Sequence, residues 1–144
     1  MGQKDIKSND FIDRSFYMAG KKFKSRDALV DLDNLKFDIE ARTDLQKCKN
    51  QAEAYKQIIS DSLTLKLANL IVRDGGVQEP LIVRKGQKKD ELLVFDGCRR
   101  LAALKYLFKN GNKRINLRGV KVRLLINIDK EFVEEYLSYI LVLK

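Results

Sequence analysis

The sequence predicts a single α+β domain, and three observations support this prediction. The 144 residues are enough for one compact domain with a hydrophobic core and too few for two ordinary domains. Hydrophobic residues make up 44% of the chain and charged residues 34%, which is typical of a globular protein. Apolar residues recur at helical spacing in some segments and form short β-branched runs in others, so both helices and strands are expected.

The first half of the chain predicts an arm followed by two helices. Residues 1–28 are polar, mixed in charge and interspersed with aromatics, so we expect an N-terminal arm with little regular structure that docks by its aromatic side chains. Residues 29–38 alternate apolar and polar side chains, which predicts a short strand or extended segment at the start of a domain spanning 29–144. Helices are expected over 51–59 and about 63–73, and two glycines end the second helix.

The second half predicts a β-hairpin, a helix, a strand and a last helix. Residues 81–95 hold two strand patterns around a polar turn, and a helix is expected from Cys98 to about Lys109. A third strand over 120–126 precedes a helix that Asp129 caps. The chain stops inside an apolar run, which favours either a domain cut from a longer protein or a terminus that docks back on the core.

Composition excludes several classes of function. No apolar run reaches the roughly 18 residues that a membrane helix needs. The polar N-terminus does not resemble a secretory signal. The chain holds two cysteines, Cys48 and Cys98, and no histidine, which excludes a histidine-based triad and a zinc site with imidazole ligands. Two distant cysteines do not form a disulfide framework, so we expect a cytoplasmic protein.

Positive charge is concentrated in one part of the chain. Residues 84–123 contain 13 lysines and arginines against three acids, within a chain of net charge +9. Such a block indicates a polyanionic partner, and a solvated basic face is the alternative. The residues expected to contact DNA around the end of the third helix are Lys105, Lys109, Lys113, Arg114, Arg118 and Lys121.

The most informative segment is the turn between the strand ending near Phe95 and the helix beginning at Cys98. Gly97 allows close approach of a ligand to the backbone, or serves only as a strand-to-helix turn. Arg99 and Arg100 fall in the first helical turn, where positive charge opposes the helix dipole. A bound anion, most simply a phosphate, offsets that cost. The alternative is an ion pair with Asp96 or a neighbouring acid.

Two further residues of this turn have open roles. Asp96 is expected to cap the helix, and orienting an arginine or holding Mg²⁺ are its other candidate roles. Cys98 stands at a helix N-terminus beside two arginines, which predicts a thiol with a lowered pKa and raised reactivity.

The run Gly97-Cys98-Arg99-Arg100-Leu101-Ala102-Ala103 resembles the Gly-x-Arg-Arg-x-x-Ala motif of the ParB and sulfiredoxin superfamily. The stretch from Gly76 to Arg84, which follows a predicted helix, is similar to the glycine turn, proline and strand of that family. The stretch from Asp38 to Arg42 is similar to the segment that often carries Asn-Pro-Arg, although Ala41 replaces the proline. The resemblance covers roughly residues 29–144.

The residue after the glycine distinguishes branches of this superfamily. It is commonly glutamate in partition-type ParB proteins, whose motif holds the phosphates of CTP, and it is the catalytic cysteine of sulfiredoxins, within Gly-Gly-Cys-His-Arg. Here Cys98 is present, but the first glycine and the histidine are absent. A broad branch of ParB-like proteins from bacteria, phages and mobile elements reads Gly-Asn-Arg-Arg-Leu-Ala-Ala-Leu-Lys. This chain departs from it only at Cys98 and is most similar to it.

The resemblance implies a ParB/sulfiredoxin-like fold, with a small mixed sheet and packed helices, that binds CTP or ATP with Mg²⁺ and allows slow hydrolysis. It implies DNA as a partner of the wider protein, and a homodimer is compatible with it. The residues expected at the nucleotide are Gly97, Cys98, Arg99, Arg100, Gly76, Gln78 and Arg42. For Gly76 and Gln78, turn chemistry alone is the other interpretation. Two alternative functions stay open: a sulfiredoxin-like or phosphotransfer enzyme that uses Cys98, and a DNA-binding module with a degenerate nucleotide pocket.

Overall fold

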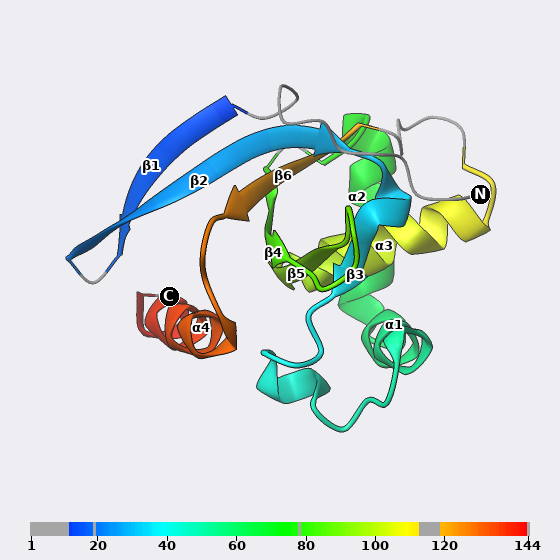
Figure 1. Cartoon of the computed structure of the whole chain (residues 1–144). Helices are drawn as coiled ribbons and strands as arrows, with labels where there is room; N and C mark the ends of the chain where they lie inside the picture. Colours follow the sequence, from blue (N-terminus) through cyan, green and yellow to red (C-terminus); the bar gives the residue numbers. More distant parts are fainter. Residues whose placement is uncertain (1–11, 19, 78, 113–118, 144) are drawn as a thin grey trace.

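The computed structural model describes residues 12–18, 20–77, 79–112 and 119–143 of the chain. Figure 1 shows the arrangement of the elements, whose order and bounds are β1 (Ile12–Met18), β2 (Lys21–Val30), η2 (Leu32–Asn34), β3 (Leu35–Phe37), η3 (Thr43–Leu45), α1 (Gln51–Ile59), α2 (Ser62–Asp74), β4 (Leu81–Lys85), β5 (Leu92–Asp96), α3 (Cys98–Lys109), β6 (Val120–Leu125) and α4 (Lys130–Leu143).

The described strands form one sheet of six in the order β1-β2-β6-β4-β5-β3. β3 lies parallel to β5 and β4 lies parallel to β6, whereas the other neighbours are antiparallel. The protein is therefore mixed α+β with a mixed sheet, and the coarse fold class predicted from the sequence is confirmed.

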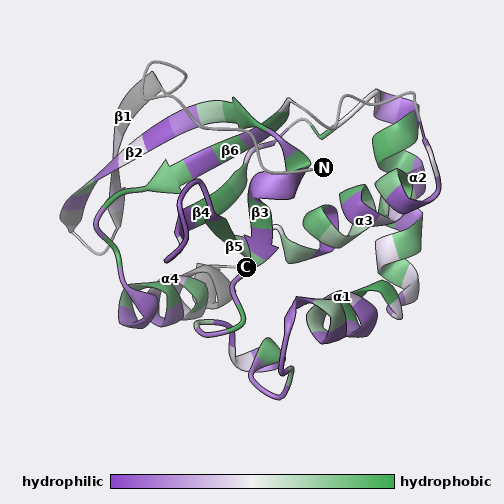
Figure 2. Ribbon diagram, turned by 45° about the vertical axis from the view of Figure 1, so that its right-hand side comes forward, coloured by the Kyte–Doolittle hydropathy of each residue, from purple (hydrophilic) through white to green (hydrophobic). Residues whose placement is uncertain are grey.

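The sheet separates two layers of helices. On one face, inward residues such as Val83, Val94 and Val122 pack with the buried residues of α1, α2 and α3. On the other face, Phe95 and Leu125 pack with Val133 of α4 and with residues flanking that helix. Figure 2 shows hydrophobic residues along the central strands, and alternate residues of a strand pack toward opposite layers, as Val94 and Phe95 do.

The elements around the functional motif agree closely with the sequence pattern. The helix over 51–59 is confirmed as α1, and the predicted hairpin of 81–95 is confirmed as the antiparallel pair β4–β5. The predicted helix after Gly97 is α3. Asp129 caps α4 as predicted, because its Oδ1 accepts a hydrogen bond from the N–H of Phe132 at 2.9 Å.

For the part that the structure describes, the N-terminal prediction is wrong about the lack of regular structure, whereas docking through an aromatic side chain is confirmed by Phe23, which packs on Phe132 of α4. Residues 12–18 and 21–30 form the strands β1 and β2 instead of an irregular arm, and β2 runs through the expected boundary between residues 28 and 29. The single strand expected over 29–38 is divided among the end of β2, η2 and β3. The physical reason is that β2 continues the sheet by pairing with β6 over residues 25–30, a distant contact that no local pattern reveals.

A buried ion pair fixes the segment that follows β3. The carboxylate of Asp38, which is fully buried, accepts two hydrogen bonds from Arg84 of β4, at 2.7 and 2.9 Å. Its Oδ1 also accepts the N–H of Ala41 at 3.3 Å, while the N–H of Asp38 donates to the carbonyl of Val94 at 3.0 Å. Asp38 therefore joins β4, β5 and the segment leading to Arg42.

Replacing Asp38 with alanine should destabilise the domain strongly, because Arg84 would keep a buried charge without its partner. We expect a loss of about 3–5 kcal/mol in the free energy of unfolding, measured by urea denaturation. The matched control is Arg73→Ala, which breaks the exposed Arg73–Asp74 pair and should cost about 0–1 kcal/mol. Equal losses in the two variants would contradict this role of Asp38.

Candidate functional site

The turn between β5 and α3 is built on the backbone conformation of Gly97. This residue is the N-cap of α3 and has φ 99° and ψ 24°, a left-handed conformation that side chains other than glycine disfavour. A Cβ at this position would lie 2.7 Å from Cδ2 of Leu81 and 2.9 Å from Nη2 of Arg100. No side chain caps the first turn of α3, so its N–H groups have no N-cap side-chain oxygen as a partner.

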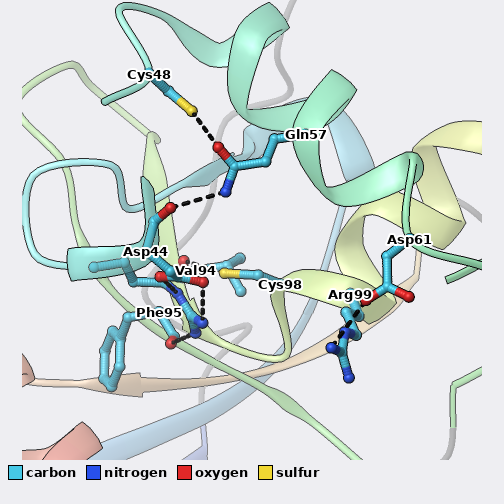
Figure 3. Close-up of polar contacts among 9 residues, drawn as sticks. Asp44, Cys48, Gln57, Asp61, Val94, Phe95, Cys98 and Arg99 are labelled. Atoms are coloured by element: carbon cyan, nitrogen blue, oxygen red, sulfur yellow. Dashed lines mark hydrogen bonds and ion pairs between the residues drawn. The ribbon is translucent and has the colours of Figure 1, made fainter. Parts of the chain in front are cut away.

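Arg99 projects from the first turn of α3 and makes an ion pair. Its Nη2 lies 3.0 Å from Oδ2 of Asp61, and 57% of its side chain is exposed (Figure 3). Asp61 is the N-cap of α2, and its Oδ1 accepts the N–H of Leu63 at 2.9 Å. The acid that pairs with the motif is therefore Asp61 rather than Asp96.

Arg100 holds the loop between α2 and β4 against the turn. Its Nη1 donates to the carbonyl of Glu79 at 3.0 Å, and its side chain is half-buried. Gly75 and Gly76 both have positive φ, and their N–H groups bond to carbonyls at the end of α2. Gly76 thus serves the C-terminal turn of α2, and Gln78 lies outside the described residues.

Arg42 reaches the same turn from a different part of the chain. Its Nη1 donates to the carbonyl of Phe95 at 2.8 Å, and its Nε and Nη2 donate to the carboxylate of Asp44 at 2.9 and 2.8 Å. Burial alone would lower the pKa of Arg42, but the hydrogen bonds and charge of Asp44 raise it overall. Hydrogen bonding from Arg42 in turn lowers the pKa of Asp44.

The prediction of a reactive Cys98 is wrong. The residue is only 5% exposed, and its Sγ donates to the carbonyl of Val94 at 3.3 Å (Figure 3). Burial raises the pKa of Cys98 to about 12, although the nearby charge of Arg42 acts in the opposite direction. Cys98 shares a helix face with the buried Leu101 and Ala102, so packing outweighs its place at the helix N-terminus.

Asp96 does not cap α3, because Gly97 occupies the N-cap position. Oδ2 of Asp96 instead accepts a hydrogen bond from the hydroxyl of Tyr136 in α4, at 3.2 Å. Burial and the charge of Asp96 raise the pKa of Tyr136. Among the described residues, no three His, Cys, Asp or Glu side chains gather into a group that could hold a metal ion.

The described members of the expected DNA-binding set do not form one surface. Lys105 is half-buried, and burial lowers its pKa to about 8, with nearby Lys36 and Lys109 acting in the same direction. The Nζ of Lys109 lies 4.0 Å from the ring centroid of Tyr55. Lys121 alternates with Val120 and Val122 in β6, which places it on the sheet face opposite α3. The remaining members, Lys113, Arg114 and Arg118, lie outside the described residues.

The structure brings together residues that the sequence does not connect. Asp61 pairs with Arg99 of the turn, although the two lie far apart in the chain, whereas Asp44 pairs with Arg42, only two residues away. The side-chain Nε2 of Gln57 in α1 donates to the carbonyl of Asp44 at 2.8 Å, which ties η3 to α1 (Figure 3). A helix start at Asp61 is a sequence signal, because aspartate is a favoured N-cap, but its contact with Arg99 depends on how α2 and α3 pack.

In comparisons with known proteins, no family model, no curated protein and no solved structure matches this chain. Within the described part of the chain, no helix has the length and apolar character needed to cross a membrane. The function is therefore argued from the geometry of the turn.

Cys98 should react slowly with a thiol reagent in the folded protein. A pKa near 12 in place of about 9 leaves about a thousandfold less thiolate at neutral pH. We expect Cys48→Ser, which retains only Cys98, to react with Ellman's reagent far more slowly in buffer than in urea. Cys98→Ser, which retains the half-buried Cys48, is the control. Equal rates for Cys48→Ser in buffer and in urea would contradict the buried thiol.

Proposed function

We propose that this domain binds the phosphate groups of a nucleoside triphosphate, CTP or ATP, at the N-terminal end of α3. The observation that carries the proposal is the left-handed Gly97 at the N-cap, with three guanidinium groups placed around the turn that it forms. Helix N–H groups without a capping side chain and bidentate guanidinium donors are the groups that proteins use to bind phosphate. The ParB-like motif supports the same ligand class.

The three arginines have different roles in this proposal. Arg42 and Arg100 hold the backbone around the turn, through the carbonyls of Phe95 and Glu79. Arg99 is the most exposed of the three, and within the described part of the chain its guanidinium makes an ion pair with Asp61. A phosphate would therefore take the place of Asp61 at Arg99, and Asp61 acts as a competitor of the ligand.

Binding, without hydrolysis, is what the described residues support. Mg²⁺ in nucleotide sites takes many of its ligands from phosphates and water, so the lack of a three-acid cluster in the described ranges is compatible with a metal-bound nucleotide. Asp96 is engaged by Tyr136, and Cys98 is buried, so neither is well placed as a reacting group. The geometry accordingly favours a nucleotide-binding module over an enzyme that uses Cys98.

Arg99→Ala should weaken nucleotide binding about 10- to 100-fold, because it removes a charge-assisted contact to phosphate. The measurement is calorimetric titration with CTP, ATP, GTP and UTP in the presence of Mg²⁺. Arg73→Ala removes an exposed arginine from the end of α2 and is the matched control, with unchanged affinity expected.

Asp61→Asn tests the competition directly. Asparagine caps a helix about as well as aspartate, so α2 should remain intact while Arg99 loses its charged partner. We therefore expect tighter nucleotide binding than in the parent protein. Failure of the folded parent to bind any of the four nucleotides, or equal affinities for Arg99→Ala and Arg73→Ala, would overturn the proposal.

A further inference from the structure

We propose that the β1–β2 hairpin is a binding arm for double-stranded DNA, in which Lys22 and Lys24 contact backbone phosphates. This site is separate from the turn at Gly97, and none of the basic residues named above for DNA belongs to it. Residues 12–30 contain five lysines and arginines against two aspartates. One of those acids, Asp27, is already engaged by Arg123 of β6 at 2.9 and 3.1 Å.

The hairpin extends beyond the rest of the sheet as a two-stranded ribbon. β6 pairs with β2 only over residues 25–30, whereas β1 pairs with β2 over residues 21–27. Residues 21–23 of β2 therefore have β1 as their strand partner and lie past the end of β6, whereas the carbonyl of Lys24 still accepts the N–H of Ile126, just after β6, at 3.0 Å. Figure 1 shows this end of the hairpin reaching away from α1, α2 and α3, on the side of the molecule where α4 lies.

One face of the ribbon is polar and open to solvent. Tyr17 lies opposite Lys22 and Ser15 lies opposite Lys24 in the register, so these four side chains share a face. All four are exposed, and Tyr17 is 72% exposed. Figure 2 shows hydrophilic residues along β2 where it leaves the sheet. The ammonium groups of the two lysines and the hydroxyls of Ser15 and Tyr17 can donate hydrogen bonds to phosphate and sugar oxygens.

The opposite face anchors the ribbon to the body. The ring of Phe23, which lies between Lys22 and Lys24 in β2, packs edge-on against Phe132 of α4 with centroids 4.5 Å apart. Phe132 stacks on Tyr136 at 6.4 Å, and Tyr136 contacts the ring of Phe95 at 5.4 Å. This aromatic row holds the ribbon in place, so the two lysines are presented without the cost of ordering a free loop.

The shape of the arm favours duplex DNA over duplex RNA. Neighbouring strands lie about 4.8 Å apart, so a two-stranded ribbon fits the major groove of B-DNA, which is about 12 Å wide. The major groove of A-form RNA is deep and narrow and does not admit such an element. The positive charge of the arm complements the phosphates on either side of the groove.

The test is fluorescence anisotropy of a labelled DNA duplex of about 20 base pairs, titrated with the protein at several salt concentrations. We expect Lys22→Ala/Lys24→Ala to weaken binding about tenfold at low salt and to reduce the slope of log affinity against log salt by about 2. The matched control is Lys47→Ala/Lys49→Ala, which removes the same charge from two exposed lysines near the start of α1 and should have little effect.

Three outcomes would overturn the proposal. The first is no binding of the DNA duplex by the parent protein at low salt. The second is equal loss in the two double variants, which would assign binding to net charge rather than to the ribbon. The third is equally tight binding of an RNA duplex of the same sequence, which would remove the argument from groove shape.

Thermal unfolding of each variant establishes that the compared proteins are folded, and nucleotide binding by the same samples reports separately on the turn at Gly97.

Discussion

The left-handed backbone of Gly97 is the constraint on which the arrangement of the site depends. It turns the chain from β5 into α3 within a single residue, in a space where a Cβ would meet Leu81 and Arg100. Because the helix begins there, Cys98 falls on its buried face and Arg99 on its exposed side. One backbone conformation therefore decides which side chain enters the core and which faces a ligand.

A second constraint holds the other part of the site in place. Asp38 is buried against Arg84 and hydrogen-bonded to Ala41, and this brings Arg42 to the carbonyl of Phe95. Asp44 and Asp61 balance the charge of Arg42 and Arg99 in the free protein. The arginines of the site are therefore held with different strength by their partners: Arg42 makes two hydrogen bonds to the carboxylate of Asp44, whereas Arg99 makes a single exposed contact with Asp61. A phosphate therefore displaces an existing partner most easily at Arg99.

The local sequence pattern predicted the elements near the motif, but it failed for elements whose formation depends on contacts between distant parts of the chain. The hairpin β4–β5 and the helices α1 and α3 follow from apolar spacing and glycine positions, which act over a few residues. Residues 12–18 lack a clean alternation of apolar and polar side chains, and they form an edge strand that pairs with β2, which β6 in turn joins to the rest of the sheet. The thiol of Cys98 illustrates a competition between two effects: its place at a helix N-terminus predicted a low pKa, but it lies on the helix face of Leu101 and Ala102 and is buried. Burial raises the pKa of Cys98 because it disfavours the charged thiolate more strongly than the nearby charge of Arg42 favours it.

The central claim is that phosphate binds at the first turn of α3, in competition with Asp61. The most direct measurement is a titration of the ¹⁵N-labelled protein with inorganic tripolyphosphate, followed through the backbone amide resonances. The account predicts that the largest shifts occur at Gly97, Arg99 and Arg100, and that Asp61→Asn reaches saturation at lower tripolyphosphate concentration. Shifts confined to exposed lysines such as Lys22 and Lys47, with the amide of Gly97 unmoved, would contradict it.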